Sequence, residues 1–424
     1  MHFAVALFVL VMTFVPGTAW AQSSGKGGPT LIPLQVVQLA DDDGSRQATV
    51  TVQEMRAWIR FANRAFSAAG IRLSYQGNRS DTAFLRNTVL NGMDPADWNA
   101  SFREACGQAD RVVARYPGKL VVFIRWGTGP SPTGNANGGG DWDFVVMGTF
   151  EAMNHCGHPH FDAFAHEVGH HFGLGHTFSN TFPSREAAEK YLLDRGNKPE
   201  AFDGDGFTDT SPDPSVGPLE CDRTRAISLN GLRFVLPRRN LMSYYDERDS
   251  LTPQQVQRVR WMLRKRLENK LTMPKNRCPA PIEAESLKVS DVRNASTVVQ
   301  EMTGFGMVGR VHGWSGNTQL FIGAEPGGSV TLTFPIPAAR NCALNVYLTQ
   351  TPDFGIGKFK LDGKALGGPV DCYAPMVMPS GRISLGRVEL SKGEHRLEVT
   401  VVGKNELSTK YSYGIDCLEL SDAP

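Results

Sequence analysis

The feature that most constrains this chain is the segment of residues 166–176, which reads HEVGHHFGLGH. It places His166, Glu167, His170, Gly173 and His176 in the spacing H-E-x-x-H-x-x-G-x-x-H. Side chains four residues apart lie on one face of a helix, so His166 and His170 can both present an imidazole nitrogen to one ion. The segment therefore predicts a helix that carries a metal site.

The third histidine indicates which kind of metal site this is. Gly173 lets the chain turn out of the helix, so that His176 can return as a third ligand. Three histidines leave one position of a zinc ion open for water, which is typical of a catalytic site. Glu167 stands beside the ligands, where it can accept a proton from that water and pass it to a leaving amine. The pattern predicts one zinc ion and peptide hydrolysis; the alternative is a histidine-rich surface helix without metal.

The first residues of the chain differ from the rest. Residues 1–21 contain an apolar run from Phe3 to Val15, a Pro-Gly pair and the ending Ala19-Trp20-Ala21. A short apolar run that ends in a small-x-small sequence is typical of a secretory signal peptide and is too short to anchor the chain. We expect a secreted or periplasmic protein, with no membrane span after signal cleavage.

The net charge bears on the kind of partner, and the cysteine content bears on disulfide bonding. The chain has 424 residues, which suggests two or three folding units, and its net charge of +1 argues against a nucleic-acid partner. Outside the cytosol thiols tend to pair in disulfide bonds. The seven cysteines fall into an N-terminal set of three, which leaves one thiol unpaired, and a C-terminal set of four, which could form two disulfide bridges. Which cysteines pair stays open. The sets are Cys106, Cys156 and Cys221, and Cys278, Cys342, Cys372 and Cys417.

The chain divides into two structural regions. Residues 31–272 alternate between strand patterns and amphipathic helices, which predicts an α/β (α+β) domain with a mixed sheet and the metal-carrying helix. Residues 273–281 contain three prolines and are predicted to be a linker. Residues 282–424 contain short β-rich runs and turn residues, which predicts a β-sandwich or jelly roll. The expected strands are 30–39, 71–75, 120–126 and 143–150, and the expected helices are 52–69, 160–172 and 253–271.

These residues resemble the metzincin clan of zinc metallopeptidases. The clan has a methionine turn below the metal, matched here by NLMSYY with Met242. Within the clan the chain looks most like the pappalysin family, because DTSP at residues 209–212 is followed by Cys221. The resemblance implies a secreted endopeptidase with protein or peptide substrates, in which Met242 forms a floor under the zinc. It also implies that Tyr244 approaches the metal or stabilises the oxyanion; simple packing is the alternative.

Acidic residues suggest a second metal. The loop of residues 203–209 carries Asp203, Asp205 and Asp209 at a spacing that could wrap calcium. Pappalysin-like enzymes use calcium near this region, which the resemblance extends to this chain. A solvated acidic turn remains an equal alternative.

The last region resembles the galactose-binding-like sandwiches of carbohydrate-binding modules, through IEAE at residues 282–285 and GIDCL at residues 414–418. This resemblance implies that Glu283, Glu285 and Asp416 hold a structural calcium ion and that carbohydrate is a possible partner. Trp314 either stacks on a sugar ring or packs in the interior.

Three functional hypotheses follow. The first is a secreted zinc endopeptidase with an accessory binding domain. The second is a carbohydrate- or matrix-binding protein in which the metzincin-like domain is catalytically idle. The third is a zinc hydrolase that acts on an amide or a sugar conjugate. An edge strand able to pair with an extended peptide, for which residues 143–150 are the candidate, would favour the first.

Overall fold

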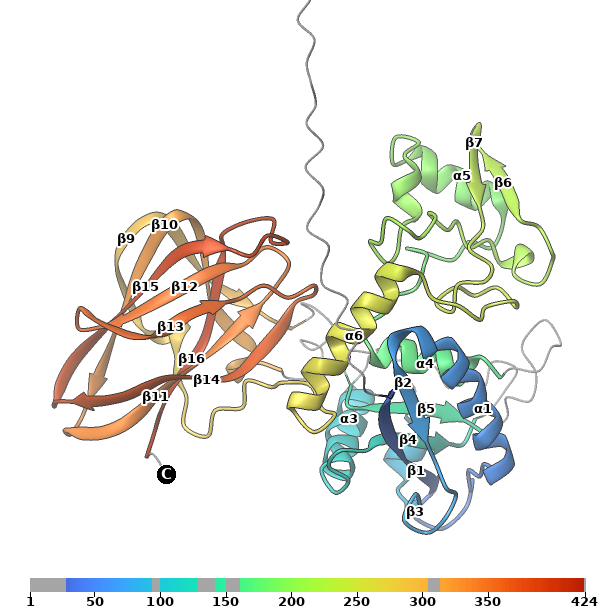
Figure 1. Ribbon diagram of the computed structural model, residues 1–424, viewed down its shortest axis with the longest axis horizontal. Coiled ribbons are helices and arrows are strands. Elements are labelled where there is room, and N and C mark those ends of the chain that lie inside the picture. The colour runs from blue at the N-terminus through green and yellow to red at the C-terminus, as the bar shows by residue number, and fades with distance from the viewer. Residues whose placement is uncertain (1–27, 94–99, 128–141, 150–160, 304–312, 423–424) are drawn as a thin grey trace, which may run out of the picture.

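The computed structural model describes residues 28–93, 100–127, 142–149, 161–303 and 313–422, and these form an α/β part and a β-sandwich on either side of helix α6, Pro253–Glu268 (Figure 1). The proposed signal peptide, the cysteine at position 156 and the glycine-rich stretch at 134–140 lie outside the described residues. Within the described residues, no helix is both long and apolar enough to cross a membrane.

The sheet of the α/β part consists of strands β1 to β5, and every described pairing in it is parallel. The order is β2-β1-β4-β5, with β3 also paired to β1. A mixed sheet was the expectation, and among the described residues no antiparallel strand joins this sheet. The strands are β1 Thr30–Ala40, β2 Ile71–Ser74, β3 Thr82–Arg86, β4 Leu120–Arg125 and β5 Phe144–Gly148.

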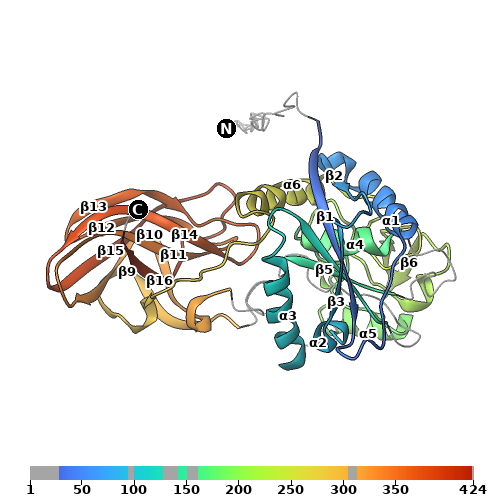
Figure 2. The same cartoon turned by 90° about the horizontal axis from the view of Figure 1, so that it is seen from below.

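Both faces of this sheet are covered by helices, which explains why β4 and β5 are buried at every residue. Ile32 and Leu34 of β1 pack with α1 and α4, whereas Val37 and Leu39 pack with α2 and α3 on the other side. Figure 2 shows α1 and α3 on opposite sides of the sheet. The helices are α1 Val52–Ala65, α2 Thr88–Asn91, α3 Ala100–Val113 and α4 Ala163–His171.

Local signals set the ends of two long helices. Thr51 and Glu54 form a capping box at the start of α1, and Thr252 and Gln255 form another at the start of α6. A short 3₁₀ turn follows α1 and ends at Gly70, whose φ of 74° suits glycine. The predicted helices over 52–69 and 253–271 are therefore present but shorter.

Between α4 and α6 lies a small lobe that the sequence patterns did not predict. It contains α5, Arg185–Leu193, and the hairpin β6, Ala226–Leu229, and β7, Leu232–Val235. Its own apolar cluster includes Phe182, Phe202 and Phe234. The lobe carries the chain from the metal segment back to the methionine turn.

The β-sandwich is built from antiparallel strands in one continuous sheet of nine, in the order β13-β12-β15-β10-β16-β11-β14, with β8 on β16 and β9 on β10. Its apolar core includes Val330, Leu332, Phe334 and Ile415. The strands are β8 Ile282–Glu283, β9 Lys288–Glu301, β10 Thr318–Ile336, β11 Arg340–Gln350, β12 Gly355–Leu361, β13 Lys364–Asp371, β14 Met378–Leu390, β15 Gly393–Lys404 and β16 Tyr413–Ser421.

The segment expected to be a linker is a bonded connection. Lys275 Nζ lies 2.8 Å from Asp110 Oδ2 and 3.1 Å from Asp143 Oδ2. Asn276, which is 2% exposed, donates to Leu348 O and accepts from the backbone of Gly381. One apolar cluster spans both parts of the chain, since Trp314, Ala374 and Met378 belong to the cluster that contains the core of the α/β part.

Candidate metal centre

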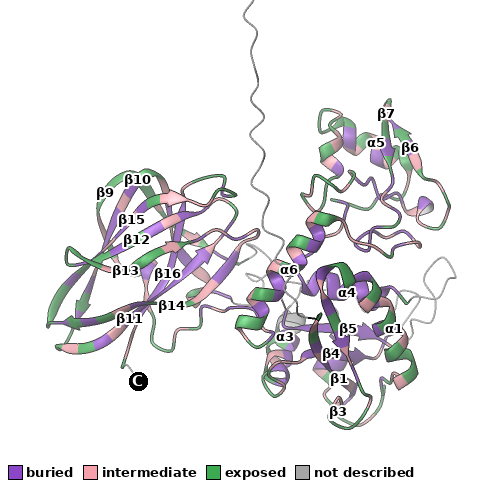
Figure 3. Cartoon of the chain, in the orientation of Figure 1, coloured by how far each residue is buried: buried purple, intermediate pink, exposed green. Residues whose placement is uncertain are grey.

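Helix α4 holds two of the predicted ligands. It is buried along its whole length (Figure 3), since it packs between the sheet and α1. His166 and His170 are one helical turn apart, and their Nε2 atoms are 3.1 Å apart. The spacing H-E-x-x-H therefore places both imidazoles at one point, as expected for residues on one helical face.

The turn after α4 brings the third histidine to the same point. Gly173 has a φ of 77°, which an L side chain rarely adopts, and its N–H donates to His170 O at 2.8 Å. His176 Nε2 then lies 3.1 Å from that of His170 and 3.2 Å from that of His166. Among the described residues, these three histidines are one of two groups of at least three metal-ligand side chains whose ligand atoms all lie within 4.8 Å of one another.

The ring orientations fit a metal ion. His166 Nδ1 lies 2.8 Å from Leu241 O, and His170 Nδ1 lies 2.8 Å from Leu174 O, so each Nδ1–H donates to a carbonyl and each Nε2 keeps its lone pair. Burial is the largest cause that lowers the pKa of His166 and of His176, and it lowers the pKa of His170 to about 4. The rings are therefore neutral at neutral pH, as metal binding requires.

The distances between the three nitrogens also match one ion. Two nitrogens bound to one tetrahedral zinc at about 2.05 Å each are about 3.3 Å apart. The observed separations of 3.1 to 3.2 Å are close to this value. The chemistry and spacing of the three donors thus suit zinc.

The methionine turn packs against the segments that carry the ligands. Met242 is fully buried, and its Sδ would lie 2.5 Å from a Cβ added at Gly169 of α4. Its carbonyl accepts from the N–H of Thr177, next to the third ligand, and its N–H donates to Asn240 Oδ1. The turn is thus in contact with both ligand-bearing segments, as the predicted floor requires.

Two charged residues beside the first ligand were not singled out in the sequence. Arg248 forms a buried ion pair with Asp162, and its Nη1 lies 3.2 Å from His166 Nδ1 and 2.9 Å from Ser243 O. Asp162 immediately precedes α4 and Arg248 follows the methionine turn, so only the fold brings them together. A lone arginine or aspartate carries no motif that could have identified them.

A buried carboxylate supports the segment after the third ligand. Asp213 Oδ2 accepts from Thr177 Oγ1 at 2.6 Å, and its Oδ1 accepts from Tyr245 OH at 2.8 Å. Burial raises the pKa of Asp213, although these hydrogen bonds oppose the shift. Asp213 directly follows the DTSP segment that supported the family resemblance.

Glu167 and Tyr244 lie at the same centre. Glu167 is 7% exposed and adjoins His166 in α4. The ring of Tyr244 lies 4.9 Å from that of His176 and 4.6 Å from that of Phe178, centroid to centroid. Burial, with the negative charge of Glu167 as the next cause, raises the pKa of Tyr244 to about 12. The phenol therefore stays protonated and can donate a hydrogen bond.

The acidic loop 203–209 does not form a comparable group. Its carboxylates are used within the loop and by α6: Asp203 Oδ1 accepts from the backbone of Gly206, Asp205 Oδ2 from Gln255, and Asp209 Oδ2 from the backbone of Gln254. These three aspartates are absent from the described groups whose ligand atoms all lie within 4.8 Å of one another. The geometry favours the acidic-turn alternative over a calcium loop.

The acidic residues of the sandwich do converge. Glu283, Asp416 and Cys417 form the second group with ligand atoms within 4.8 Å. Glu283 Oε2, Glu285 Oε2 and Asp416 Oδ1 are buried without a hydrogen-bond partner, and burial raises the pKa of Asp416 to about 8. Carboxylates that each keep one buried oxygen without a partner suit a hard cation such as calcium. Burial raises the pKa of the Cys417 thiol, which is therefore a poor ligand for it.

Other predicted features of the sandwich have structural roles. Trp314 is 4% exposed and donates from Nε1 to Thr349 Oγ1 at 2.8 Å, which favours packing over sugar stacking.

The two disulfide bridges that were possible in the sandwich are not formed. The thiols of Cys278, Cys342, Cys372 and Cys417 are free, the last three buried within the sandwich. Cys221 of the α/β part is disulfide-bonded.

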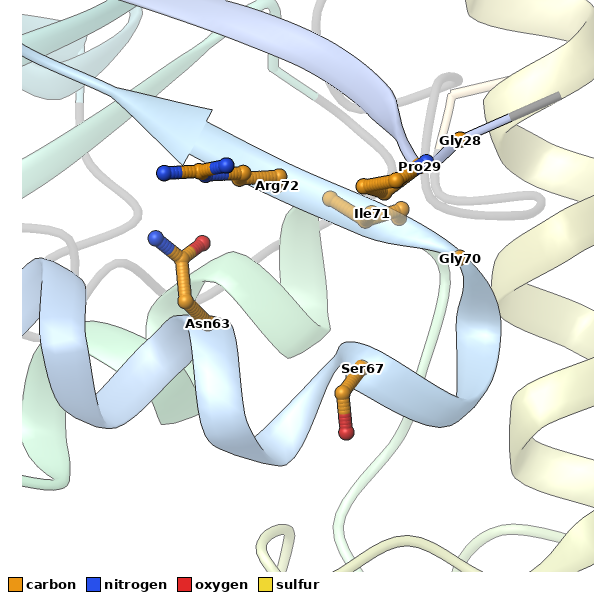
Figure 4. Close-up of a pocket in the computed structure, with 7 residues that line it drawn as sticks. All are labelled: Gly28, Pro29, Asn63, Ser67, Gly70, Ile71 and Arg72. Carbon is orange, nitrogen blue, oxygen red and sulfur yellow. The ribbon is translucent and has the colours of Figure 1, made fainter.

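A surface pocket at the start of β1 and β2 is separate from this centre (Figure 4). Two of its three polar side chains are already bonded: Asn63 exchanges two hydrogen bonds with the backbone of Leu73, and Ser67 Oγ donates to Arg64 O. It is lined by Gly28, Pro29, Asn63, Ser67, Gly70, Ile71 and Arg72. No set of catalytic side chains is assembled there.

No protein-family profile matches the chain, and no curated protein does. Solved structures that are similar to parts of it include a family 35 carbohydrate-binding module from Clostridium thermocellum. The two sequences are 13% identical, the match covers 34% of this chain and 98% of that chain, and the TM-score is 0.23. The CBM36-1 domain of a multidomain xylanase from the hindgut metagenome of Trinervitermes trinervoides has 13% identity, covers 34% of this chain and 98% of that chain, and has a TM-score of 0.24. A Paenibacillus xanthan lyase is 16% identical; the match covers 36% of this chain and 15% of that chain, with a TM-score of 0.30.

Proposed function

We propose that the protein is an exported zinc-dependent endopeptidase in which His166, His170 and His176 hold the metal. The observation that carries this proposal is the convergence of three neutral imidazoles, two buried and one half-buried, whose Nε2 atoms lie 3.1 to 3.2 Å apart. When bound, a zinc ion supplies Lewis-acid polarisation of the scissile carbonyl and of a water molecule. Three protein ligands leave room for both.

The side chains around this centre account for proton transfer and charge stabilisation. The carboxylate of Glu167 accepts a proton from the attacking water and then delivers it to the nitrogen of the leaving amine. The hydroxyl of Tyr244, which burial keeps protonated, donates to the oxygen on which negative charge develops. The carbonyl of Leu241 orients the His166 ring, and the ion pair of Arg248 and Asp162 lies beside that ring and is bonded to Ser243 O of the methionine turn.

A peptide is the favoured substrate because of where the sheet ends. Strand β5 is the terminal strand in the order of the described sheet, and it is the last strand before α4 in the chain. An extended peptide that adds to a sheet edge gains main-chain hydrogen bonds along its length. This proposal places the peptide beside the helix that carries Glu167.

A carbohydrate- or matrix-binding protein with an idle metal domain is the second candidate. The observation that favours it is the antiparallel sandwich with its cluster of buried carboxylates, Glu283, Glu285 and Asp416. The solved structures named above are carbohydrate-binding modules and a polysaccharide lyase by title, and none of those named is a protease. The two candidates differ in whether the zinc centre turns over substrate.

The deciding experiment measures hydrolysis of a mixed, unfolded protein substrate together with bound zinc, in the wild type and in Glu167→Gln. We expect one zinc per chain in both proteins and a rate at least about 100-fold lower in Glu167→Gln, because the general base is lost while the ligands remain. Calcium is added to the assay so that a cation is available to the carboxylate cluster of Glu283, Glu285 and Asp416.

A wild type that binds zinc but cleaves neither protein nor peptide, while retaining a polysaccharide in a pull-down, would support the binding-protein candidate instead. A wild type that binds no zinc would remove the basis of the endopeptidase proposal. Equal rates in the two proteins would show that Glu167 is not the base.

A further inference from the structure

The turn of residues 172–175 determines where two of the three ligands lie. Leu174 O accepts from His170 Nδ1, and two residues later the chain reaches His176, the one ligand that does not belong to α4. Gly173 lies at the centre of this turn with its φ of 77°. A displacement of this turn would move His176 and release the His170 ring together.

Three side chains cover Gly173. A Cβ atom added at Gly173 would lie 2.8 Å from Met262 Cε, 3.0 Å from Met376 Cε and 3.9 Å from Arg258 Cδ. Met262 and Arg258 belong to α6, but Met376 belongs to the sandwich, in the loop of residues 372–377 between β13 and β14. The sandwich thus contacts the turn that positions the third ligand.

Arg258 of α6 lies among the same elements. Its Nη1 lies 3.5 Å from Gly173 O, and its guanidinium stacks over the Phe207 ring at 5.2 Å. Burial is the main cause that lowers the pKa of the Arg258 guanidinium, and Tyr373 of the 372–377 loop lies close enough to oppose that shift. Arg258 therefore lies between the turn, the acidic loop and the sandwich.

The 372–377 loop is held in place by its surroundings. Ala374 and Met378 are fully buried in the apolar cluster of the α/β part, and Met376 packs against that cluster. Thr351 and Ala374 are joined by a backbone hydrogen bond of 3.1 Å. A loop fixed at both ends can transmit a defined position to the turn it covers.

We propose that the 372–377 loop is a positioning element of the metal centre, and that Met376 holds the Gly173 turn in the conformation that presents His176. By this proposal the β-sandwich, through Met376, supports the zinc site although it folds as a separate sheet. The proposal rests on the proposed function, because it requires that the three histidines bind zinc.

The test compares zinc release from Met376→Ala and from Met302→Ala, which removes a buried methionine of the same apolar cluster that lies outside the 372–377 loop and is not among the atoms closest to Gly173. Release is followed with a chromophoric chelator, and the cobalt-substituted proteins are compared by their visible absorption. We expect release about tenfold faster in Met376→Ala, with an altered cobalt spectrum, because supporting contacts change metal affinity by about 10- to 100-fold. Met302→Ala should lower thermal stability but release zinc at the wild-type rate.

Met376→Leu should release zinc at the wild-type rate, since leucine also fills the apolar space over Gly173. If Met376→Ala does not fold, Met376→Val provides the same comparison with a smaller loss of volume. Wild-type release from Met376→Ala would overturn the positioning role while leaving the zinc centre intact. Absence of zinc from the wild type would overturn both proposals.

Discussion

At the scale of single residues, the metal centre depends on atoms that fix each imidazole. The carbonyls of Leu241 and Leu174 accept from the Nδ1 atoms of His166 and His170, which leaves each Nε2 available. Leu241 belongs to the methionine turn and Leu174 to the turn after α4. Two backbone carbonyls from different segments thus determine the tautomer of two ligands.

Tyr244 offers a prediction at this scale. Tyr244→Phe should reduce kcat by about 100-fold, since it removes a donor to the developing oxyanion but keeps the ring that packs on His176 and Phe178. Zinc content should not change. Because burial raises the pKa of Tyr244 to about 12, the hydroxyl is protonated throughout the working range, and the loss should be the same at about pH 6 and about pH 9.

The measurement is kcat of the two proteins on one peptide substrate, with bound zinc determined in each. Equal values of kcat would assign Tyr244 to packing alone. A loss of kcat together with loss of zinc would mean that the hydroxyl supports the fold of the centre.

At the scale of elements, α4 and the methionine turn are packed so closely that a glycine is required between them. A Cβ at Gly169 would lie 2.5 Å from Met242 Sδ, and Met242 is fully buried and cannot move into solvent. The glycine between the two helical ligands therefore serves packing, because the helix would accept alanine at this position on backbone grounds.

We expect Gly169→Ala to destabilise the protein by about 2 kcal/mol, since overpacking a filled core costs about 1 to 3 kcal/mol. The matched control is Gly107→Ala, also within a helix, where an added Cβ would meet no atom within 4 Å. That change should stabilise the protein by up to about 1 kcal/mol. Chemical denaturation of both variants measures the two effects, and equal free energies of unfolding would contradict the packing role.

The elements that could be predicted from sequence are those whose signals are local. The helix around His166, the capping box at Thr252 and the strand at Thr30 follow from spacing and side-chain chemistry within a few residues. The small lobe and the parallel pairing of the sheet depend on contacts between distant segments, which periodicity does not encode. Asp162 and Arg248 were missed for the same reason, because they are 86 residues apart in the chain.

At the scale of the whole molecule, the carboxylate cluster joins the first and last strands of the sandwich. Glu283 comes from β8 and Asp416 from β16, and Ser315 between them donates to both carboxylates. Their unpartnered oxygens repel one another unless a cation or a proton lies between them. A bound cation would therefore stabilise the closed sandwich.

Calcium should raise the free energy of unfolding by about 2.7 kcal/mol at a hundredfold excess over its Kd, and removal of calcium by a chelator should reverse the gain. Asp416→Asn should abolish this response. Asp203→Asn, in the acidic loop, should retain it, because that loop does not form a comparable group. Thermal or chemical unfolding with and without calcium provides the measurement, and a response that disappears only in Asp203→Asn would place the calcium site in the loop.

The buried connection at residues 273–276 has a consequence for how such a chain can change over generations. Lys275 pairs with carboxylates of the α/β part, while Asn276 is bonded to the sandwich on both ends of its amide. Neither half can be exchanged for another module without exposing apolar surface and leaving these polar groups unsatisfied. The two folds must therefore be inherited, and must acquire compensating substitutions, as one unit.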